Sequence, residues 1–264
     1  MNYLPIFLSI KPSLVKFCIP VLLFVAFAVS SCSTRYYAPA LYQNDIQYMV
    51  KPHSKDSVRN RFYASGTYLN QGGANGQGDL KSGLLNVYRS NTLNHFNFSY
   101  GALVYTGSYK RGMYDSLMNT PSKTFGGYGF NGSASVYTAT RITDWRFGVD
   151  LSYIRESGQY LDFRRSVYGM PGVNASNQSH LIGLGVFTEF VTRISPSFNI
   201  GVKAFVNNTL SSPLKRDLSD ETGSGHTVGS NISLGYKQYT VRLSGAFSGN
   251  FVNSASQLGL TYGF

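Results

Sequence analysis

The last ten residues of the chain, Ala255-Ser-Gln-Leu-Gly-Leu-Thr-Tyr-Gly-Phe264, alternate between two kinds of side chain. Apolar or aromatic residues stand at every second position, and small or polar residues stand between them. Because successive side chains of a β-strand point to opposite faces, each kind gathers on one face. The stretch therefore predicts a strand whose apolar face carries Leu258, Leu260, Tyr262 and Phe264.

The same alternation recurs upstream and predicts ten strands after residue 60. They lie near residues 60–70, 80–90, 96–104, 124–140, 145–153, 182–193, 198–207, 231–236, 239–247 and 255–264. The clearest begins at Trp145 and places Arg146 and Asp150 on its polar face. The first two are the least clear, because Tyr63 and Leu69 put apolar side chains on both faces. The alternation of apolar and polar residues does not by itself distinguish a soluble sandwich, whose apolar face lies in the core, from a barrel that turns this face to lipid.

The connections between the predicted strands distinguish these two folds. Long connections, near 70–79, 107–123, 155–180 and 208–227, alternate with short ones at 91–94, 141–144, 194–196 and 237–238. Only the last long connection, 249–253, is modest. Short periplasmic turns opposite long external loops are typical of outer-membrane barrels. The sequence thus predicts an all-β fold: an antiparallel, up-and-down transmembrane β-barrel of about ten strands, within roughly 8 to 12.

This pattern and the final strand resemble those of bacterial outer-membrane β-barrel proteins. In that family a terminal Phe closes the last strand, and the resemblance implies that Leu258, Leu260, Tyr262 and Phe264 form a signal for the barrel-assembly machinery. The resemblance covers residues 60–264, which we expect to form the barrel domain. It indicates a class of protein and specifies no function.

The amino terminus is predicted to be a targeting segment. Lys11 and Lys16 precede the uncharged apolar run 17–29, which is too short for a membrane-spanning helix and has the length of a signal-peptide core. The run ends in Val29-Ser-Ser-Cys32, which resembles the lipobox of bacterial lipoproteins. The resemblance implies cleavage after residue 31 and lipidation of Cys32; an ordinary signal peptide with an incidental cysteine is the alternative. Residues 32–59 are expected to form a tether or a small plug.

Composition supports export and excludes a nucleic-acid partner. The chain has two cysteines, and loss of residues 1–31 removes Cys18 and leaves Cys32 without a disulfide partner. The same cleavage removes two Lys, so the formal charge falls from +11 to +9. Only 13% of residues are charged, against about 25% in soluble domains. The cations are scattered singly, which favours outer-membrane lipid and lipopolysaccharide over nucleic acid as the anionic partner.

Charged residues on the polar strand faces are the candidate lumen residues. They are Arg146, Asp150, Glu189, Arg193, Lys203 and Arg242. Because a barrel of this size has a narrow interior, these charges are expected to form a salt-bridged core. A selective pore is the alternative. The third long connection, with Tyr160, Phe163, Arg164, Arg165, Tyr168 and Met170, is either a contact surface or a loop packed over the barrel mouth.

No residue pattern predicts catalysis, a metal site or a cofactor. His95 and Ser99 lie four apart, but we interpret them as an interfacial histidine and a lumen hydroxyl, not as a base and its nucleophile. Acids of the expected outer loops include Asp79, Glu156, Asp220 and Glu221, and we interpret the last two, with His226, as solvated charges. Omptin proteases, which are also ten-stranded, use a paired-aspartate motif. This motif is absent from the sequence.

The functional expectation is a non-enzymatic outer-membrane lipoprotein with a structural or accessory role in an envelope complex. A narrow transport pore is the first alternative, and a hydrolase acting on lipid or peptide is the second. The even number of strands places both chain ends on the periplasmic side, where the lipid anchor is expected. An envelope partner would then bind through residues 33–59 or through the outer loops.

Overall fold

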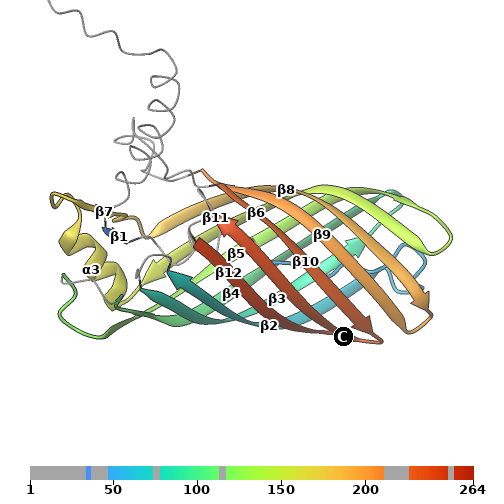
Figure 1. Ribbon diagram of the computed structural model, residues 1–264. Helices are drawn as coiled ribbons and strands as arrows, with labels where there is room; N and C mark the ends of the chain where they lie inside the picture. The colour runs from blue at the N-terminus through green and yellow to red at the C-terminus, as the bar shows by residue number, and fades with distance from the viewer. Residues whose placement is uncertain (1–33, 37–46, 74–77, 113–116, 211–225, 249–252) are drawn as a thin grey trace, which may run out of the picture. The chain divides into compact units, whose positions relative to one another are not determined.

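The alternating segments of the sequence pair into a single antiparallel sheet that closes on itself (Figure 1). The computed structural model describes residues 34–36, 47–73, 78–112, 117–210, 226–248 and 253–264. The chain divides into two units, Met1–Thr34 and Arg35–Phe264. Of the first unit only Thr34 is described, and the second contains the barrel.

The barrel has ten strands, as the sequence predicts. The strands are β2 (Asn60–Gly73), β3 (Asp79–Thr92), β4 (Phe96–Lys110), β5 (Ser122–Ala139), β6 (Thr143–Ser157), β8 (His180–Ser195), β9 (Phe198–Thr209), β10 (His226–Tyr236), β11 (Tyr239–Ser248) and β12 (Asn253–Gly263). Each pairs with its neighbour in the chain, and β12 returns to β2, with Tyr262 opposite Ala64. Closure removes the open edges that would otherwise expose unpaired backbone groups.

The two faces of the wall have opposite character. Large apolar side chains point outward on every strand, and Leu85, Phe147 and Leu243 are each at least 60% exposed. The inner face is polar over much of its length and holds the buried strand charges, among them Asp150 and Arg242. Since the sheet is closed, its exposed face is the apolar one all the way round. This arrangement suits lipid and confirms the transmembrane barrel over the soluble sandwich.

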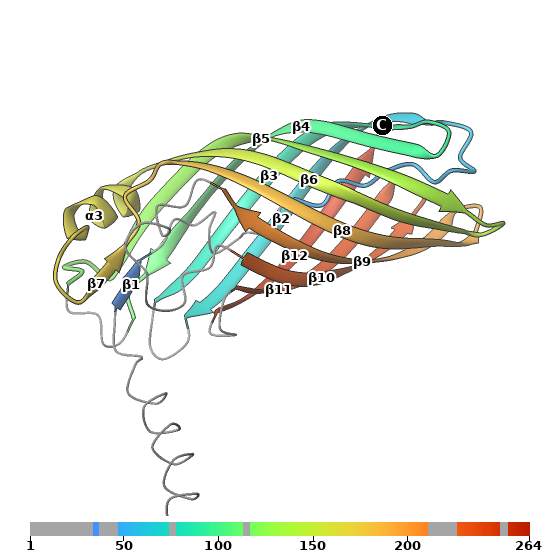
Figure 2. The same cartoon turned by 90° about the horizontal axis from the view of Figure 1, so that it is seen from above.

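Short and long connections separate the two ends of the barrel, as predicted. At the turn end the connections are 93–95, 140–142, 196–197 and 237–238. At the loop end, β6 and β8 are joined by residues 158–179, which contain α3 (Gln159–Val167) and β7 (Val173–Ala175). β7 forms a separate two-stranded sheet with β1 (Thr34–Tyr36). Figure 2 shows α3 and β7 beyond the barrel strands, at the end opposite the carboxyl terminus.

Two details of the predicted strands are wrong. β2 and β3 extend further than expected, so their connection shrinks to 74–78 and Asp79 becomes the first residue of β3. Likewise Glu156 lies within β6 and is buried, so it is not an outer-loop acid. The ladder continues because inward apolar residues such as Leu69 and Leu80 pack together there.

No helix among the described residues is long and apolar enough to cross a membrane.

Candidate functional site in the barrel lumen

A stretch of chain just before β2, the first strand of the barrel, lies in the turn-end half of the lumen. This lumen segment, residues 47–56, has no regular secondary structure apart from a turn (Figure 2). Its Gln47, Tyr48, Met49, Lys51 and His53 are each less than 9% exposed. A buried coil must satisfy its backbone groups with partners on the wall, and the lumen segment does so repeatedly.

Backbone groups of the lumen segment bond to the inner face of β3. The Val50 N–H donates to the Tyr88 hydroxyl at 2.9 Å, and the Val50 carbonyl accepts from the Ser90 hydroxyl at 2.7 Å. The Pro52 carbonyl accepts from the Thr92 hydroxyl at 3.0 Å. The segment is therefore held by specific bonds to the wall.

Side chains of the lumen segment reach two further strands of the wall, β5 and β8. The Tyr48 hydroxyl donates to Glu189 Oε1 at 2.5 Å, and Lys51 Nζ donates to Ser133 Oγ at 2.8 Å. Together with the β3 bonds, these contacts tie the lumen segment to three strands of the wall, β3, β5 and β8.

Arg146 organises the charges around the lumen segment. Its guanidinium lies 3.2 Å from Asp144 Oδ2 and 3.2 Å from Glu189 Oε2, and it donates to the Pro52 carbonyl at 3.1 Å. All three charged side chains are nearly fully buried. Because a buried charge is tolerated only when paired, this triad ties β6, β8 and the lumen segment into one unit.

A second buried ion pair lies deeper in the lumen. Lys203 Nζ is 2.6 Å from Asp150 Oδ2 and 4.1 Å from the centre of the Phe187 ring. Arg242, from β11, donates to Gln257 Oε1 at 3.1 Å and to Thr67 Oγ1 at 3.3 Å. The inner wall thus neutralises Lys203 with Asp150 and also holds Arg242 with neutral oxygen acceptors.

Arg193 differs from the other five candidate lumen charges. Its side chain is about a quarter exposed and pairs with Asp56, the last residue of the lumen segment. The structure therefore places Arg146, Asp150, Glu189, Lys203 and Arg242 inside the barrel, and Arg193 at its turn-end mouth.

His53 is a titratable residue in the turn-end part of the lumen segment. It lies outside the strands, and its Nε2 is 3.5 Å from Asp144 Oδ1. Burial lowers the pKa of the imidazole below its usual value of 6.5, and the Asp144 carboxylate opposes that change. Arg193 and Arg146 lower this pKa further, whereas Asp56 raises it. The neutral imidazole is therefore the form that this site favours.

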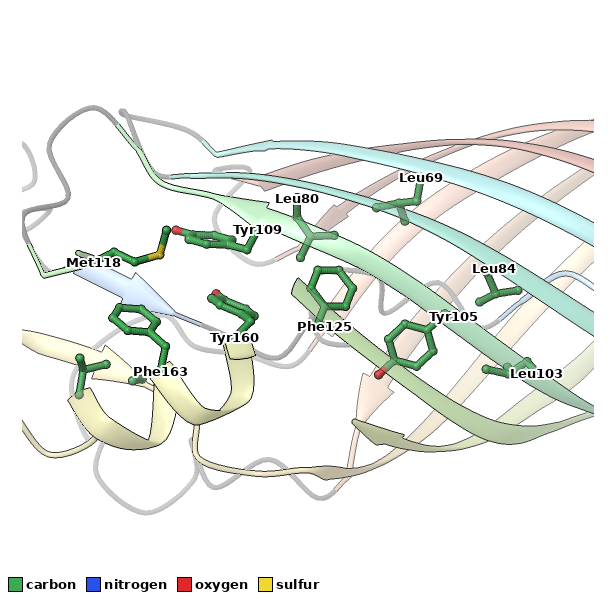
Figure 3. Close-up of a cluster of buried hydrophobic side chains, with 12 residues drawn as sticks. Leu69, Leu80, Leu84, Leu103, Tyr105, Tyr109, Met118, Phe125, Tyr160 and Phe163 are labelled. Carbon is green, nitrogen blue, oxygen red and sulfur yellow. The ribbon is translucent and has the colours of Figure 1, made fainter. Parts of the chain in front are cut away.

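The loop-end half of the lumen is lined in a different way, by apolar and aromatic side chains that pack together. Figure 3 shows Tyr109, Phe125 and Tyr160 gathered between the wall and α3. The Tyr109 and Tyr160 rings stack with centroids 4.4 Å apart, and Phe125 packs against Tyr160 at 6.3 Å. The cluster, called here the loop-end cluster, comprises Leu69, Leu80, Leu84, Leu103, Tyr105, Tyr109, Met118, Phe125, Tyr160, Phe163, Val167 and Ala175.

One ion pair holds α3 over this cluster. Arg164 of α3 is fully buried, lies 2.6 Å from Glu156 Oε1 and donates to the Ser176 carbonyl at 2.6 Å. Tyr160, Phe163 and Arg164, predicted to lie either on a contact surface or in a packed loop, are buried. Tyr168 and Met170, from the same connection, are exposed.

Several inward amides have no hydrogen-bond partner among the described residues. In Asn86, Asn131 and Asn231, both the side-chain Oδ1 and the Nδ2 are buried and lack such a partner. Buried polar atoms require partners, so water molecules are expected beside these three amides.

The remaining predicted residues fall into three groups. Leu258, Leu260 and Phe264 face outward, and Tyr262 is half-buried among neighbouring rings. His95 does not share a strand face with Ser99, because it lies in an exposed turn with a φ of 59°, whereas Ser99 is buried against Ser90. Cys32, Asp220 and Glu221 lie outside the described residues, as does the side chain of His226.

The sequence does not reveal that Glu156 is buried in a strand or that Tyr109 and Phe125 belong to the loop-end cluster. It also reveals none of the contacts of the lumen segment. The segment Met49-Val-Lys-Pro-His-Ser-Lys-Asp-Ser has no period that marks it as buried. Within the described residues no group of three or more His, Cys, Asp and Glu side chains is arranged to hold a metal ion.

Comparison with known proteins finds the barrel in solved structures only. No family model matches the chain, and no curated protein does. The β-domain of the Bordetella autotransporter BrkA is 11% identical, with 78% of this chain and 99% of that chain covered and a TM-score of 0.44. LpxR from Salmonella typhimurium is 10% identical, over 80% of this chain and 86% of that chain, with a TM-score of 0.43. The translocator domain of NalP from Neisseria meningitidis is 10% identical, over 80% and 90%, with a TM-score of 0.42.

Proposed function

We propose that the protein is a closed β-barrel of the bacterial outer membrane with a structural or accessory role in the cell envelope. The observation that carries this proposal is the packing found in both halves of the lumen. The buried lumen segment occupies the turn-end half, and the loop-end cluster packs in the other, which supports a barrel that is closed to solutes. A barrel closed at both halves acts through its rims, where it meets other envelope components.

The loop-end rim offers the better contact surface. Tyr168 and Met170 are 47% and 44% exposed, and Arg165 of the same connection is also exposed. Aromatic residues, Met and Arg are enriched at protein interfaces, so this rim suits an envelope protein partner. Lipopolysaccharide would surround the barrel at the same level, where the net positive charge of the chain favours it.

A non-enzymatic role is supported by the surroundings of the candidate groups. His95, the histidine that the sequence places near a serine, lies in a turn with its ring tilted against that of Tyr137, and the Ser99 hydroxyl bonds to the Ser90 hydroxyl instead. His180 instead meets the Tyr153 hydroxyl at 2.7 Å on the outer side of the wall. Neither arrangement joins a base to a nucleophilic side chain that a third group orients.

A narrow pore is the second candidate, and the partnerless amides favour it. Asn86, Asn131 and Asn231 imply water within the lumen. In this alternative, the lumen segment would leave the barrel to admit solute.

Planar-bilayer recordings of the purified protein separate the two candidates. We expect the wild-type protein to show no conductance steps. Replacing residues 47–56 with a Gly/Ser stretch of equal length should leave the loop-end cluster in place and conduct weakly at most. Adding the substitutions Tyr160→Ala and Phe163→Ala should open a stable channel. Stable steps from the wild-type protein would overturn the closed-barrel proposal in favour of the pore.

A further inference from the structure

We infer that the chain threads its own barrel, from Arg35 and Tyr36 at the loop end, on the cell-surface side, to the start of β2 at the turn end. The inference rests on the outer-membrane placement proposed above, because that placement puts the long loops outside the cell. It adds a topology that the closed-barrel proposal does not require, since a plug can also enter and leave at one end.

The first support is the direction of the lumen segment. Gln47, at its start, accepts a hydrogen bond from Thr67, which lies seven residues into β2 from the turn end. Asp56, at its finish, pairs with Arg193, two residues from the turn-end limit of β8. The segment therefore runs from the middle of the barrel towards the turn end.

Contacts between these ends follow the same order. Tyr48 meets Glu189, six residues from the end of β8, and Pro52 meets Thr92, the last residue of β3. Ser54 meets Asp144, the second residue of β6. The contacts of Gln47 and Tyr48 thus lie six or seven residues from the turn-end limits of their strands, and those of Pro52, Ser54 and Asp56 lie within two. The chain then enters β2 from that end. Traced backwards, the segment points towards the loop end.

The second support is independent of the lumen contacts. Arg35 and Tyr36 belong to β1, which pairs with β7 in the connection between β6 and β8. That connection is at the loop end, beyond the strands (Figure 1). The chain is thus fixed at the loop end at residue 36 and in mid-barrel at residue 47.

The length of chain between these points is sufficient. From residue 36 to residue 47 there are 11 steps, which span at most about 36–40 Å when extended. A 14-residue strand such as β2 rises about 46 Å along its own axis, or about 35 Å along the barrel at a tilt near 40°. The connection has to cross only the loop-end part of this height.

The threaded topology changes the expected position of the lipid anchor. Cys32 precedes Arg35 by three residues and lies outside the described residues. A lipid on Cys32 would then enter the outer leaflet of the membrane, at the cell surface. This proposal replaces the sequence-based expectation of an anchor in the inner leaflet on the periplasmic side.

The test is the labelling of single cysteines on intact cells with a membrane-impermeant maleimide. The test variant is Thr34→Cys, and the unsubstituted protein gives the background from Cys32. Met170→Cys marks the loop end, and Gln238→Cys marks the exposed turn between β10 and β11. Heat-modifiable gel mobility of each variant shows that its barrel has folded.

We expect Thr34→Cys to label on intact cells to the extent of Met170→Cys, and Gln238→Cys to label only after permeabilisation. Labelling of Thr34→Cys only after permeabilisation, as for Gln238→Cys, would overturn the inference. If Thr34→Cys does not fold, an epitope inserted after Ser33 and detected by antibody on intact cells gives the same distinction. Bilayer recordings test the closed-barrel proposal independently of this labelling. A protein that shows no conductance but has residue 34 on the periplasmic side would refute the threading and leave the closed-barrel proposal intact.

Discussion

Ser54 donates both its backbone N–H and its hydroxyl to the Asp144 carboxylate, at 2.8 Å and 2.5 Å. Asp144 is the second residue of β6, at the turn end, and Ser54 belongs to the lumen segment. This two-point contact fastens the segment to the wall just before the chain turns into β2. The oxygen that accepts from the Ser54 N–H, Asp144 Oδ2, also accepts from the Arg146 guanidinium at 3.2 Å.

Removing the Ser54 hydroxyl should loosen the lumen segment without unfolding the barrel. A hydrogen bond to a charged group contributes about 1.5–3 kcal/mol, so Ser54→Ala should speed amide exchange in residues 47–56 by roughly 10- to 150-fold. Hydrogen–deuterium exchange with mass spectrometry measures this. Ser195→Ala, which removes an exposed hydroxyl near a turn, should leave exchange in the segment unchanged. Equal exchange in the wild-type protein and Ser54→Ala would contradict the proposed role of this contact.

Seating of the lumen segment should weaken in acid. The pKa of His53 is lowered in the folded protein, so proton binding favours the state in which the segment is released. The contribution of neutral His53 to this seating is complete above about pH 6.5, the pKa of an unperturbed imidazole. It falls as the pH drops through that value and stops changing below the lower pKa that His53 has in the folded protein. Protease sensitivity of residues 47–56 should rise over this window, and His53→Gln should remove that dependence. The same pH profile in His53→Gln would assign the change to another group.

The Lys203–Asp150 pair should stabilise the barrel only as a pair. Lys203→Met leaves the Asp150 charge buried alone and should cost about 3–5 kcal/mol of unfolding free energy. The double variant Lys203→Met with Asp150→Leu removes both charges and should recover most of that loss. Urea unfolding in lipid vesicles measures all three proteins. Additive losses in the double variant would show that the two residues act independently.

The outward face should reject charge most strongly at mid-height. Leu151 lies near the middle of β6 and is 52% exposed, so Leu151→Arg should cost about 2–4 kcal/mol in vesicles. Tyr239→Arg, at the start of β11 near the rim, should cost about 0–1 kcal/mol. If the protein were instead a soluble sandwich, it would fold in water without detergent, and the two substitutions would there cost the same unfolding free energy.

Much of the wall follows from the sequence because barrel strands obey a two-residue period. The alternation from Trp145 to Tyr153 and the short turn at 237–238 predict β6 and the β10–β11 hairpin. The prediction weakens at the loop end, where Leu80 and Leu103 face inward and break the polar-inside rule. These residues obey a different constraint, which is packing against α3 and one another.

The candidate site is predictable only in part. Inward charges such as Asp150 and Lys203 are found from phase alone, but phase does not reveal that they pair with each other across β6 and β9. The lumen segment is invisible for a physical reason. A coil that bonds to the wall through backbone groups of Val50 and Pro52 needs no side-chain pattern.

Cross-linking tests most directly the central claim that residues 47–56 close the barrel from inside. In a Cys32→Ser background, the pair Ser54→Cys with Asp144→Cys places two thiols where serine and carboxylate now touch. Mild oxidation of the folded protein should join them within one chain, with the linked peptides identified by mass spectrometry. The control pair Ser54→Cys with Asp79→Cys, at the loop end of β3, should stay reduced. An oxidised protein in which residue 54 joins residue 79, joins another molecule or joins nothing would contradict the account.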